Sequence, residues 1–463
     1  MTQALFPRNF RKPYPDAIRA EGCYIVDDQN RRILDAAGSA AVVNVGHGRA
    51  EVADALAAQA RKLAFAHTSQ FQTKTSERLA ERLRALAPAN FHDGGRVFFV
   101  SGGSEATETA LKLARQYHLE RGQPQRVRMV ARRQSYHGST LGAMAVSGNV
   151  ARRAPYLPLL PDWGHIAPCF CYHCPFERTF PDCKLACADD LETLIQQVGA
   201  ETVAAFLFEP LSGATLGAAA PPATVDDQLV YARRIADICK RHGILLIADE
   251  VMTGMGRTGK HFAVEHFSGK GWAVEPDMML VGKGIASGYA PLGAVLVAPN
   301  VAEAFAAGTG IFKHGFTYQA HPVAMAASHA VLDILEGERL FARVTPAGQM
   351  LRRALEPLAA SPVVGDVRGL GLLLGVEFVR DRATRTPFPP AAGVAERVRK
   401  VCWDHNVAVY PIQGCVDGAA GDHVLLAPPF ILTETEAAEI ARALEAAASE
   451  VAAMARDASL PKQ

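Results

Sequence analysis

Residues 276–293, PDMMLVGKGIASGYAPLG, put a lone lysine at the end of an apolar run. The run 278–281 predicts a buried strand, and Lys283 stands between two glycines just beyond it. Burial disfavours the charge of a lysine, so its neutral amine becomes available to form an imine with a carbonyl group. A lysine that reaches out to water is the plain alternative. Residues upstream favour the buried amine.

A second apolar run ends in an acid. Residues 243–248, GILLIA, lead directly to Asp249. Two strands that end in a lysine and an acid suit pyridoxal 5′-phosphate, because the lysine holds its aldehyde and the acid keeps its pyridine nitrogen protonated. We therefore predict this cofactor, with Lys283 and Asp249 as the catalytic residues.

A glycine-rich turn that could hold the cofactor's phosphate lies further upstream. In RVFFVSGGSEATETALKLAR, an apolar strand at 97–100 passes through Gly103 into an amphipathic helix that starts near Ser104. Backbone N–H groups at a helix N-terminus, together with a serine hydroxyl, bind phosphate. Each of the three patterns is weak alone, but together and in this order they specifically predict a pyridoxal phosphate site.

The chain resembles the class III (omega-amino acid) aminotransferases, a family of fold-type I pyridoxal phosphate enzymes. The resemblance runs from EGCYIVDDQNRRILDAAG to LLAPPFILTETE, and the motifs that carry it are SGGSEATETA, SYHGST, FEP, ADEVMTGMGRTG, VGKGIASGYAPLGA and HGFTYQAHP. It implies an α/β fold in which helices flank the mostly parallel central sheet of a large domain, while both termini build a smaller α+β domain. The expected domains are 61–325 for the large one, with 1–60 and 326–463 forming the small one.

The resemblance also implies roles for residues around the ring of the cofactor. Tyr136 would stack on the pyridine ring, with His137 beside it, although a Tyr-His pair that merely packs in the interior is the alternative. Val251 would pack against the opposite face of the ring. Glu209, at the end of the apolar run 203–208, would lie close to the cofactor.

Other implied contacts concern the phosphate and a second subunit. Gly103 and Ser104 would hold the phosphate within one chain. Thr317 would hydrogen-bond the phosphate bound by a partner subunit, and the loop 64–72, AFAHTSQFQ, would reach into the neighbouring site. The implied assembly is a homodimer with shared active sites.

Composition argues against several other classes of protein. The 463 residues include 48 basic and 47 acidic side chains, so no broad field attracts nucleic acid or an anionic membrane. The N-terminus, MTQALFPRNFRKPYPDA, is polar, and no apolar run reaches the length of a membrane span. We expect a cytoplasmic protein with no nucleic-acid or membrane partner.

Five of the nine cysteines gather in one segment, in the pattern C-x-C-x2-C-x8-C-x3-C from Cys169 to Cys187. Thiolates at such spacing hold zinc or an iron–sulfur cluster if they converge. The spacing lacks the paired C-x2-C knuckles of a zinc ribbon, and the predicted chemistry needs no metal. We therefore expect a structural thiol-rich excursion with no metal, while metal binding or redox sensing remains the alternative.

The residues that grip a substrate carboxylate in several branches of the family are missing. Where the ornithine and 4-aminobutyrate branches carry an arginine before Ala-Pro-Pro, this chain has Leu425, and 412–420 holds no arginine. Arg368 is predicted to belong to a turn, and Arg257 and Lys260 to be solvated loop charges. The sequence leaves open how a carboxylate would be held.

The predicted function is transamination through a Schiff base on Lys283. An amino group would move from a primary amine or omega-amino acid to a keto acid, with pyruvate as the first choice. Both substrates are small molecules. The alternative is a racemase, aminomutase or decarboxylase on the same scaffold, because the motifs fix the cofactor and leave the reaction open.

Overall fold

The computed structural model describes residues 4–12, 14–221, 230–269 and 271–456, and its largest sheet has seven strands in the order β4-β10-β9-β8-β7-β5-β6. These strands are β4 (Arg96–Val100), β5 (Arg128–Arg132), β6 (His165–Ile166), β7 (Val203–Phe208), β8 (Leu245–Asp249), β9 (Met278–Val281) and β10 (Gly293–Val297). β10 runs antiparallel to both its neighbours, and the remaining pairs are parallel. The carboxyl ends of β4, β5, β7, β8 and β9 therefore meet at one edge of the sheet.

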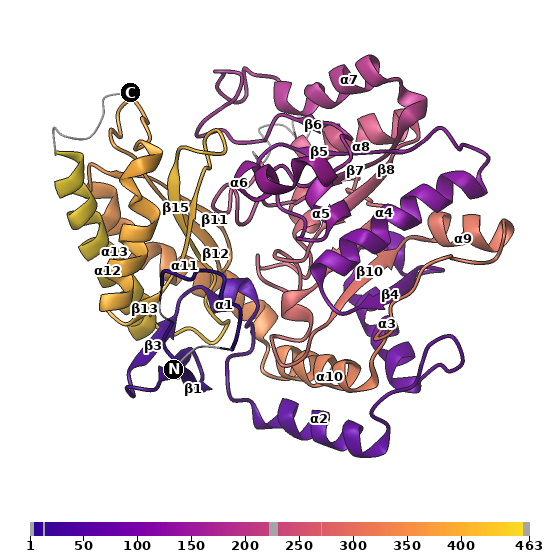
Figure 1. Ribbon diagram of the computed structural model, residues 1–463, viewed down its shortest axis with the longest axis horizontal. Coiled ribbons are helices and arrows are strands. Elements are labelled where there is room, and N and C mark those ends of the chain that lie inside the picture. Colours follow the sequence, from indigo (N-terminus) through magenta and orange to yellow (C-terminus); the bar gives the residue numbers. More distant parts are fainter. Residues whose placement is uncertain (1–3, 13, 222–229, 270, 457–463) are drawn as a thin grey trace.

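Helices cover both faces of this sheet (Figure 1). α4 (Gly103–Glu120), α5 (Leu141–Val146) and α9 (Pro299–Ala307) share one apolar core with it, while α7 (Ala186–Val198) and α8 (Tyr231–His242) share the other. Successive side chains of β8 enter opposite cores. Because both faces are buried, the strands read as continuous apolar runs. The predicted fold class is confirmed.

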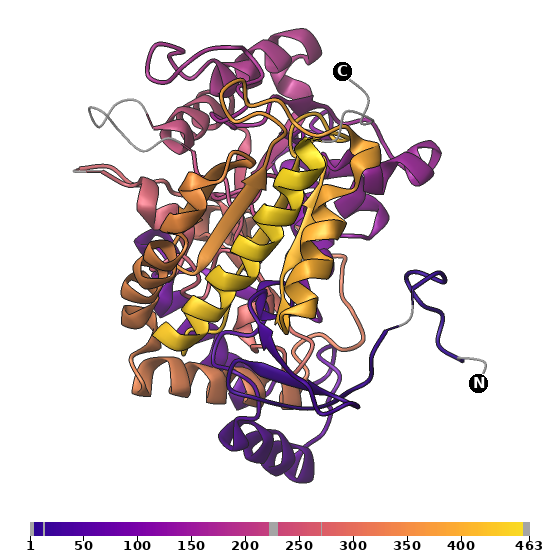
Figure 2. The same cartoon turned by 90° about the vertical axis from the view of Figure 1, so that its left-hand side faces the viewer.

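Two smaller sheets bring the two ends of the chain together. β1 (Ala17–Glu21), β2 (Tyr24–Asp27) and β3 (Arg32–Asp35) form the first sheet with β13 (Val407–Ala408). β11 (Val364–Leu370), β12 (Leu373–Phe378), β14 (Tyr410–Gln413) and β15 (Asp422–Leu426) form the second. α11 (Leu340–Ala354), α12 (Val394–Asp404) and α13 (Glu434–Ala455) lie beside these strands, as Figure 2 shows.

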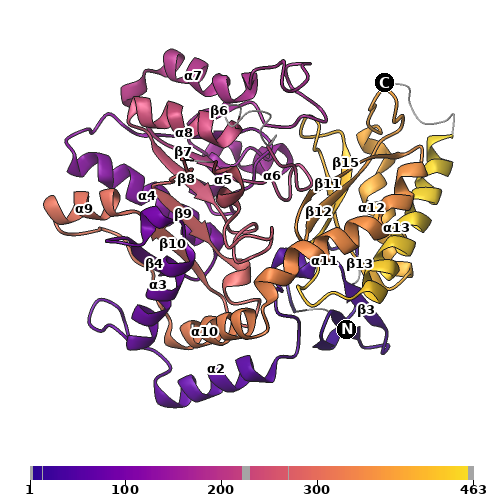
Figure 3. The same cartoon turned by 180° about the vertical axis from the view of Figure 1, so that it is seen from behind.

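Helices and a tight turn join the large sheet to the two smaller sheets. α2 (Ala50–Lys62) packs along α10 (Pro322–Gly337), and α3 (Lys74–Leu86) also contacts α10 (Figure 3). α10 continues through residue 325, and the boundaries at 60 and 325 stay predictions. Within the described ranges, no helix is long and apolar enough to cross a membrane.

The turn α1 (Gly38–Ala41) is left-handed, with φ of 53°, 50°, 70° and 60° at its four residues. Each residue with a side chain costs about 1–2 kcal/mol in this conformation. Gly38 is required at the first position, because a Cβ there would lie 2.2 Å from the Ala427 carbonyl oxygen. The chain thereby turns sharply beneath the edge of the large sheet.

Candidate active site

Lys283 projects into a cavity at the carboxyl edge of the large sheet. The residue directly follows Gly282 after β9 and has a φ of 47°, a strained value for a side-chain-bearing residue. Burial in the cavity lowers the pKa of the Lys283 amine to about 8, although the nearby carboxylates of Asp249 and Glu209 act in the opposite direction. A substantial share of this amine is therefore neutral near pH 8, as covalent capture of a carbonyl requires.

Asp249 ends β8, the strand that pairs with β9, so the acid and the lysine lie on neighbouring strands. Its Oδ1 accepts a hydrogen bond from the Val251 backbone N–H at 3.0 Å, and its Oδ2 lies 2.7 Å from His137 Nδ1. His137 is itself fixed, because its backbone N–H donates to the Ser147 hydroxyl. The carboxylate is thus held in one orientation and can still accept a hydrogen bond from a ligand.

Glu209 follows β7 and is buried beside these groups. Its carboxylate accepts hydrogen bonds from the backbone N–H groups of Gly213 and Tyr136. Burial raises the pKa of Glu209. Arg132 donates to the Glu209 backbone carbonyl and to the Ser212 hydroxyl, which fixes the loop that carries the acid.

The start of α4 forms the other end of the cavity. Gly103 and Ser104 lie in the first helical turn, where backbone N–H groups have no intrahelical acceptor. A Cβ at Gly103 would come within 2.8 Å of Val251 Cγ1, so only glycine permits this close approach. The Ser104 hydroxyl accepts a hydrogen bond from the Ser139 N–H at 3.0 Å. These donors suit a phosphate.

The cavity measures about 150 Å³ and gathers the predicted site residues except Thr317. Its lining residues are Gly103, Ser104, Tyr136, His137, Gly138, Glu209, Leu211, Ala214, Asp249, Val251, Met252, Thr253 and Lys283. A lysine amine, an oriented carboxylate and a helix N-terminus fit the aldehyde, the ring nitrogen and the phosphate of pyridoxal phosphate. Thr317 is exposed and does not line the cavity of its own chain.

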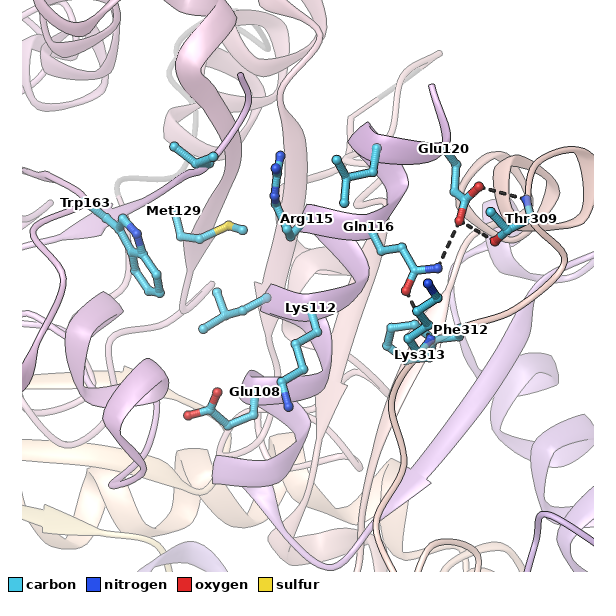
Figure 4. A pocket seen from close by; sticks show the side chains of 13 residues that line it. Glu108, Lys112, Arg115, Gln116, Glu120, Met129, Trp163, Thr309, Phe312 and Lys313 are labelled. Atoms are coloured by element: carbon cyan, nitrogen blue, oxygen red, sulfur yellow. Dashed lines mark hydrogen bonds between the residues drawn. The ribbon is translucent and has the colours of Figure 1, made fainter. Parts of the chain in front are cut away.

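A larger hollow of about 530 Å³ lies on the outer side of α4 (Figure 4). There the Glu120 carboxylate already accepts hydrogen bonds from Gln116 and Thr309. Glu108 accepts from two backbone N–H groups at the start of α5. Because these polar groups satisfy one another, we place the chemistry in the smaller cavity.

Two arginines differ from the sequence predictions. Arg257 is 1% exposed and is not a solvated loop charge, because its guanidinium donates to three backbone carbonyls and to the Asn44 side chain. Arg368 lies within β11 and not in a turn, where it pairs with Glu377 at 2.6 Å and with Asp366 at 3.1 Å. Both find buried partners that a linear sequence does not reveal. Lys260 is exposed, as predicted.

An apolar cluster that includes residues from both ends of the chain adjoins the lining of the cavity. Leu425 is 1% exposed and packs with Ala41 and with two cavity residues, Leu211 and Met252. Neither Leu211 nor Met252 was predicted as a site residue, because both read as ordinary apolar residues. Met252 follows Val251 directly, and that adjacency is the signal that could have identified it.

The thiol-rich segment stands behind the cavity. The Cys169 and Cys187 thiols lie close together, so that Cys187 raises the pKa of Cys169 and Cys169 lowers the pKa of Cys187. A small pocket is lined by Cys171, Cys174, Cys183 and Cys187. All nine cysteines are free thiols. The described residues contain no group of three or more potential ligands arranged to hold a metal ion. The structural role of the segment and the absence of a metal stay predictions.

Comparison with known proteins gives the same family. The model of the class III aminotransferases matches residues 6–448. An uncharacterised aminotransferase of Bacillus subtilis is 36% identical over 95% of this chain and 96% of its own, and the putrescine–pyruvate aminotransferase of Pseudomonas aeruginosa is 34% identical over 91% and 88%. The solved amine transaminase of an uncultivated Pseudomonas species, in its PLP-bound form, superposes with a TM-score of 0.87 at 37% identity, covering 97% and 98% of the two chains. The chain belongs to the class III aminotransferases.

Proposed function

We propose that this aminotransferase moves an amino group from a primary amine or omega-amino acid to a keto acid, with pyruvate as the acceptor. The observation that carries the proposal is the buried amine of Lys283 beside the oriented carboxylate of Asp249, in a cavity that ends at a phosphate-binding helix start. The chain uses pyridoxal phosphate, as its family does.

When bound, pyridoxal phosphate supplies an aldehyde and a pyridine ring that draws electrons from the substrate carbon. The Lys283 Nζ would hold the cofactor at its aldehyde, and the Asp249 carboxylate would keep a proton at the ring nitrogen. His137 keeps the Asp249 carboxylate turned toward the cavity. Gly103 and Ser104 bind the phosphate through the first turn of α4.

Lys283 is also the group that moves protons during transfer. With a substrate amine in place, the Lys283 Nζ would accept the proton that leaves the substrate carbon and would donate it again to the cofactor carbon that bears the amino group. A pKa of about 8 suits this task, because the amine gains and loses a proton readily near neutral pH. Tyr136 and Val251 line the cavity and would hold the ring from its two faces.

The choice of acceptor rests on a relative. The Pseudomonas aeruginosa protein is named for putrescine and pyruvate, and it matches most of this chain. Leu211 and Met252, two apolar residues of the cavity lining, would contact the carbon chain of an amine. We further propose a homodimer in which Thr317, exposed in the single chain, binds the phosphate held by a partner subunit.

The test follows the visible absorption of the bound cofactor. An omega-amine added without keto acid should bleach it, and pyruvate should then restore it, with the amine recovered as a carbonyl compound and the pyruvate as alanine. If no amine bleaches the absorption, transamination is wrong and racemase, aminomutase or decarboxylase chemistry must be examined. If bleaching occurs but only another keto acid restores the absorption, the acceptor alone is wrong.

A further inference from the structure

A keto acid brings a carboxylate, and most arginines near the cavity are already engaged. Arg132 donates to the Glu209 carbonyl and to Ser212. Arg257 is buried among backbone carbonyls, and Arg368 pairs with two carboxylates. Leu425 offers no charge. A substrate carboxylate therefore needs a cation that none of these residues supplies.

Arg152 is the cation that remains. It lies in the short helix α6 (Val150–Arg153), is exposed, and places its guanidinium 4.7 Å from the ring centre of Tyr136, a cavity-lining residue. Among the described residues, no carboxylate lies within ion-pair distance of it. Arg152 is also close enough to the active-site lysine for its charge to lower the pKa of Lys283.

The backbone around Arg152 supports this position of the side chain. Asn149 caps α6, and its side-chain oxygen accepts a hydrogen bond from the Arg152 backbone N–H at 3.0 Å. Stacking on Tyr136 orients the guanidinium plane without using its N–H donors. No residue that the structure describes accepts a hydrogen bond from these donors, which lie beside the cavity-lining Tyr136. A planar guanidinium with free donors matches a carboxylate, which it can bind through two parallel hydrogen bonds.

We propose that Arg152 binds the carboxylate of the keto acid at the mouth of the active-site cavity, in place of the arginines that this chain lacks near Leu425. The inference rests on the proposed transamination and adds the residue that recognises the acceptor substrate. Arg152 then selects acceptors that carry a carboxylate next to the carbonyl. Amine donors without a carboxylate do not need it.

A competing role for the same guanidinium is binding of the cofactor phosphate, since Tyr136 and the start of α4 line one cavity. The two roles differ in what they affect. A phosphate ligand changes the affinity for pyridoxal phosphate and slows both halves of the reaction. A carboxylate ligand changes only the half that uses the keto acid.

The experiment compares wild type, Arg152→Gln, Arg152→Lys and Arg133→Gln. Arg133 is an exposed arginine near the same segment that donates to the His165 carbonyl, so it serves as the charge-matched control. Each half-reaction is followed separately, with propylamine as donor and pyruvate as acceptor. Binding of propionate and of its neutral analogue propionamide to the holoenzyme is measured by ligand-observed NMR, and cofactor affinity by titration of the apo-protein.

We expect Arg152→Gln to raise the KM for pyruvate about 10- to 100-fold, the effect of losing a charged hydrogen-bonded pair. Arg152→Lys should recover part of this loss. The propylamine half-reaction and cofactor affinity should change less than about threefold, and the preference for propionate over propionamide should disappear. Arg133→Gln should behave as wild type.

Two results would overturn the proposal. One is an unchanged preference for propionate in Arg152→Gln, and the other is a loss of cofactor affinity that slows both half-reactions equally. A failure of the proposed function would give a different experimental result. If wild type does not react with pyruvate but binds propionate in an Arg152-dependent way, the acceptor is wrong and the carboxylate site stands.

Discussion

At the scale of single residues, the role proposed for the Lys283 amine predicts how the rate of cofactor capture depends on pH. Because the pKa of Lys283 is about 8, the neutral fraction rises about tenfold per pH unit below 8 and levels off above it. We expect the rate of pyridoxal phosphate capture by apo-protein, measured by stopped-flow absorbance, to follow this profile. Lys283→Ala should show no capture. A profile that keeps rising to pH 10 would mean that the cavity does not desolvate the amine.

Glu250, the neighbour of Asp249, makes a second pH-dependent contribution. It is fully buried, its Oε1 accepts from the Val264 N–H at 2.8 Å, and the Thr253 hydroxyl donates to its Oε2. Burial raises the pKa of Glu250 from 4.5 to about 7. The folded state therefore binds more protons than the unfolded state between these values, so the free energy of unfolding falls as pH rises through that window.

Glu250→Gln should remove the decrease in the free energy of unfolding between pH 4.5 and 7. At pH 8 the variant should exceed wild type in free energy of unfolding by up to about 3 kcal/mol, and at pH 4.5 the two should be nearly equal. Urea denaturation at both pH values measures the difference. The exposed Glu303→Gln is the control. Equal gains at both pH values would show that the charge of Glu250 is not the cause.

Residue types and spacing were enough to predict which side chains gather around Lys283, because strands that end in charged residues deliver them to one edge of a sheet. Residue types and spacing were not enough to predict the surroundings of the arginine side chains. In the sequence, Arg257 stands in the glycine-containing stretch MGRTGK and Arg152 stands beside a second arginine in VARRAP. One is buried among carbonyls and the other stacks on Tyr136, and only the fold decides between these environments.

At the scale of elements, the left-handed turn at 38–41 stores strain that can be measured. Ala40 has a φ of 70°, which costs about 1 kcal/mol or more for a residue with a Cβ. Ala40→Gly should therefore leave the free energy of unfolding unchanged or raise it by up to about 1 kcal/mol. Ala58→Gly, at an exposed position in the right-handed helix α2, should lower it by about 1 kcal/mol.

Denaturant unfolding of the two variants beside wild type provides the measurement. Equal losses in both would contradict the strain at Ala40. The sequence did not predict this turn, since GSAAVV carries one glycine and otherwise reads as helix or strand. It did predict β9, because a short apolar run is a local pattern.

At the scale of the whole molecule, the proposed sharing of sites makes a prediction about hybrids. Suppose one subunit carries Lys283→Ala and the other Thr317→Val. If Thr317 serves the partner's cofactor, both defects fall in one site and the second site is intact. The hybrid dimer should then show about half the activity of wild type and contain one site with wild-type cofactor affinity.

The hybrids can be isolated with two different affinity tags and compared with both parental homodimers. If Thr317 acted within its own chain, each site of the hybrid would carry one defect, and no intact site would form. Every motif except HGFTYQAHP stands at the end of a strand of the large sheet, so the motifs together indicate the fold of the chain. Contacts with a second chain leave no such pattern, so the dimer stays a proposal.

The pairing of β3 with β13 joins residues near the two ends of the chain, Leu34 opposite Val407. During synthesis, β3 leaves the ribosome long before β13 exists. Its edge, with unpaired N–H and C=O groups, stays open while the seven-stranded sheet is made and folds. A chain that ends before β13 therefore leaves this edge of β3 exposed to pairing with another strand, and the edge closes only after all strands of the large sheet have been made.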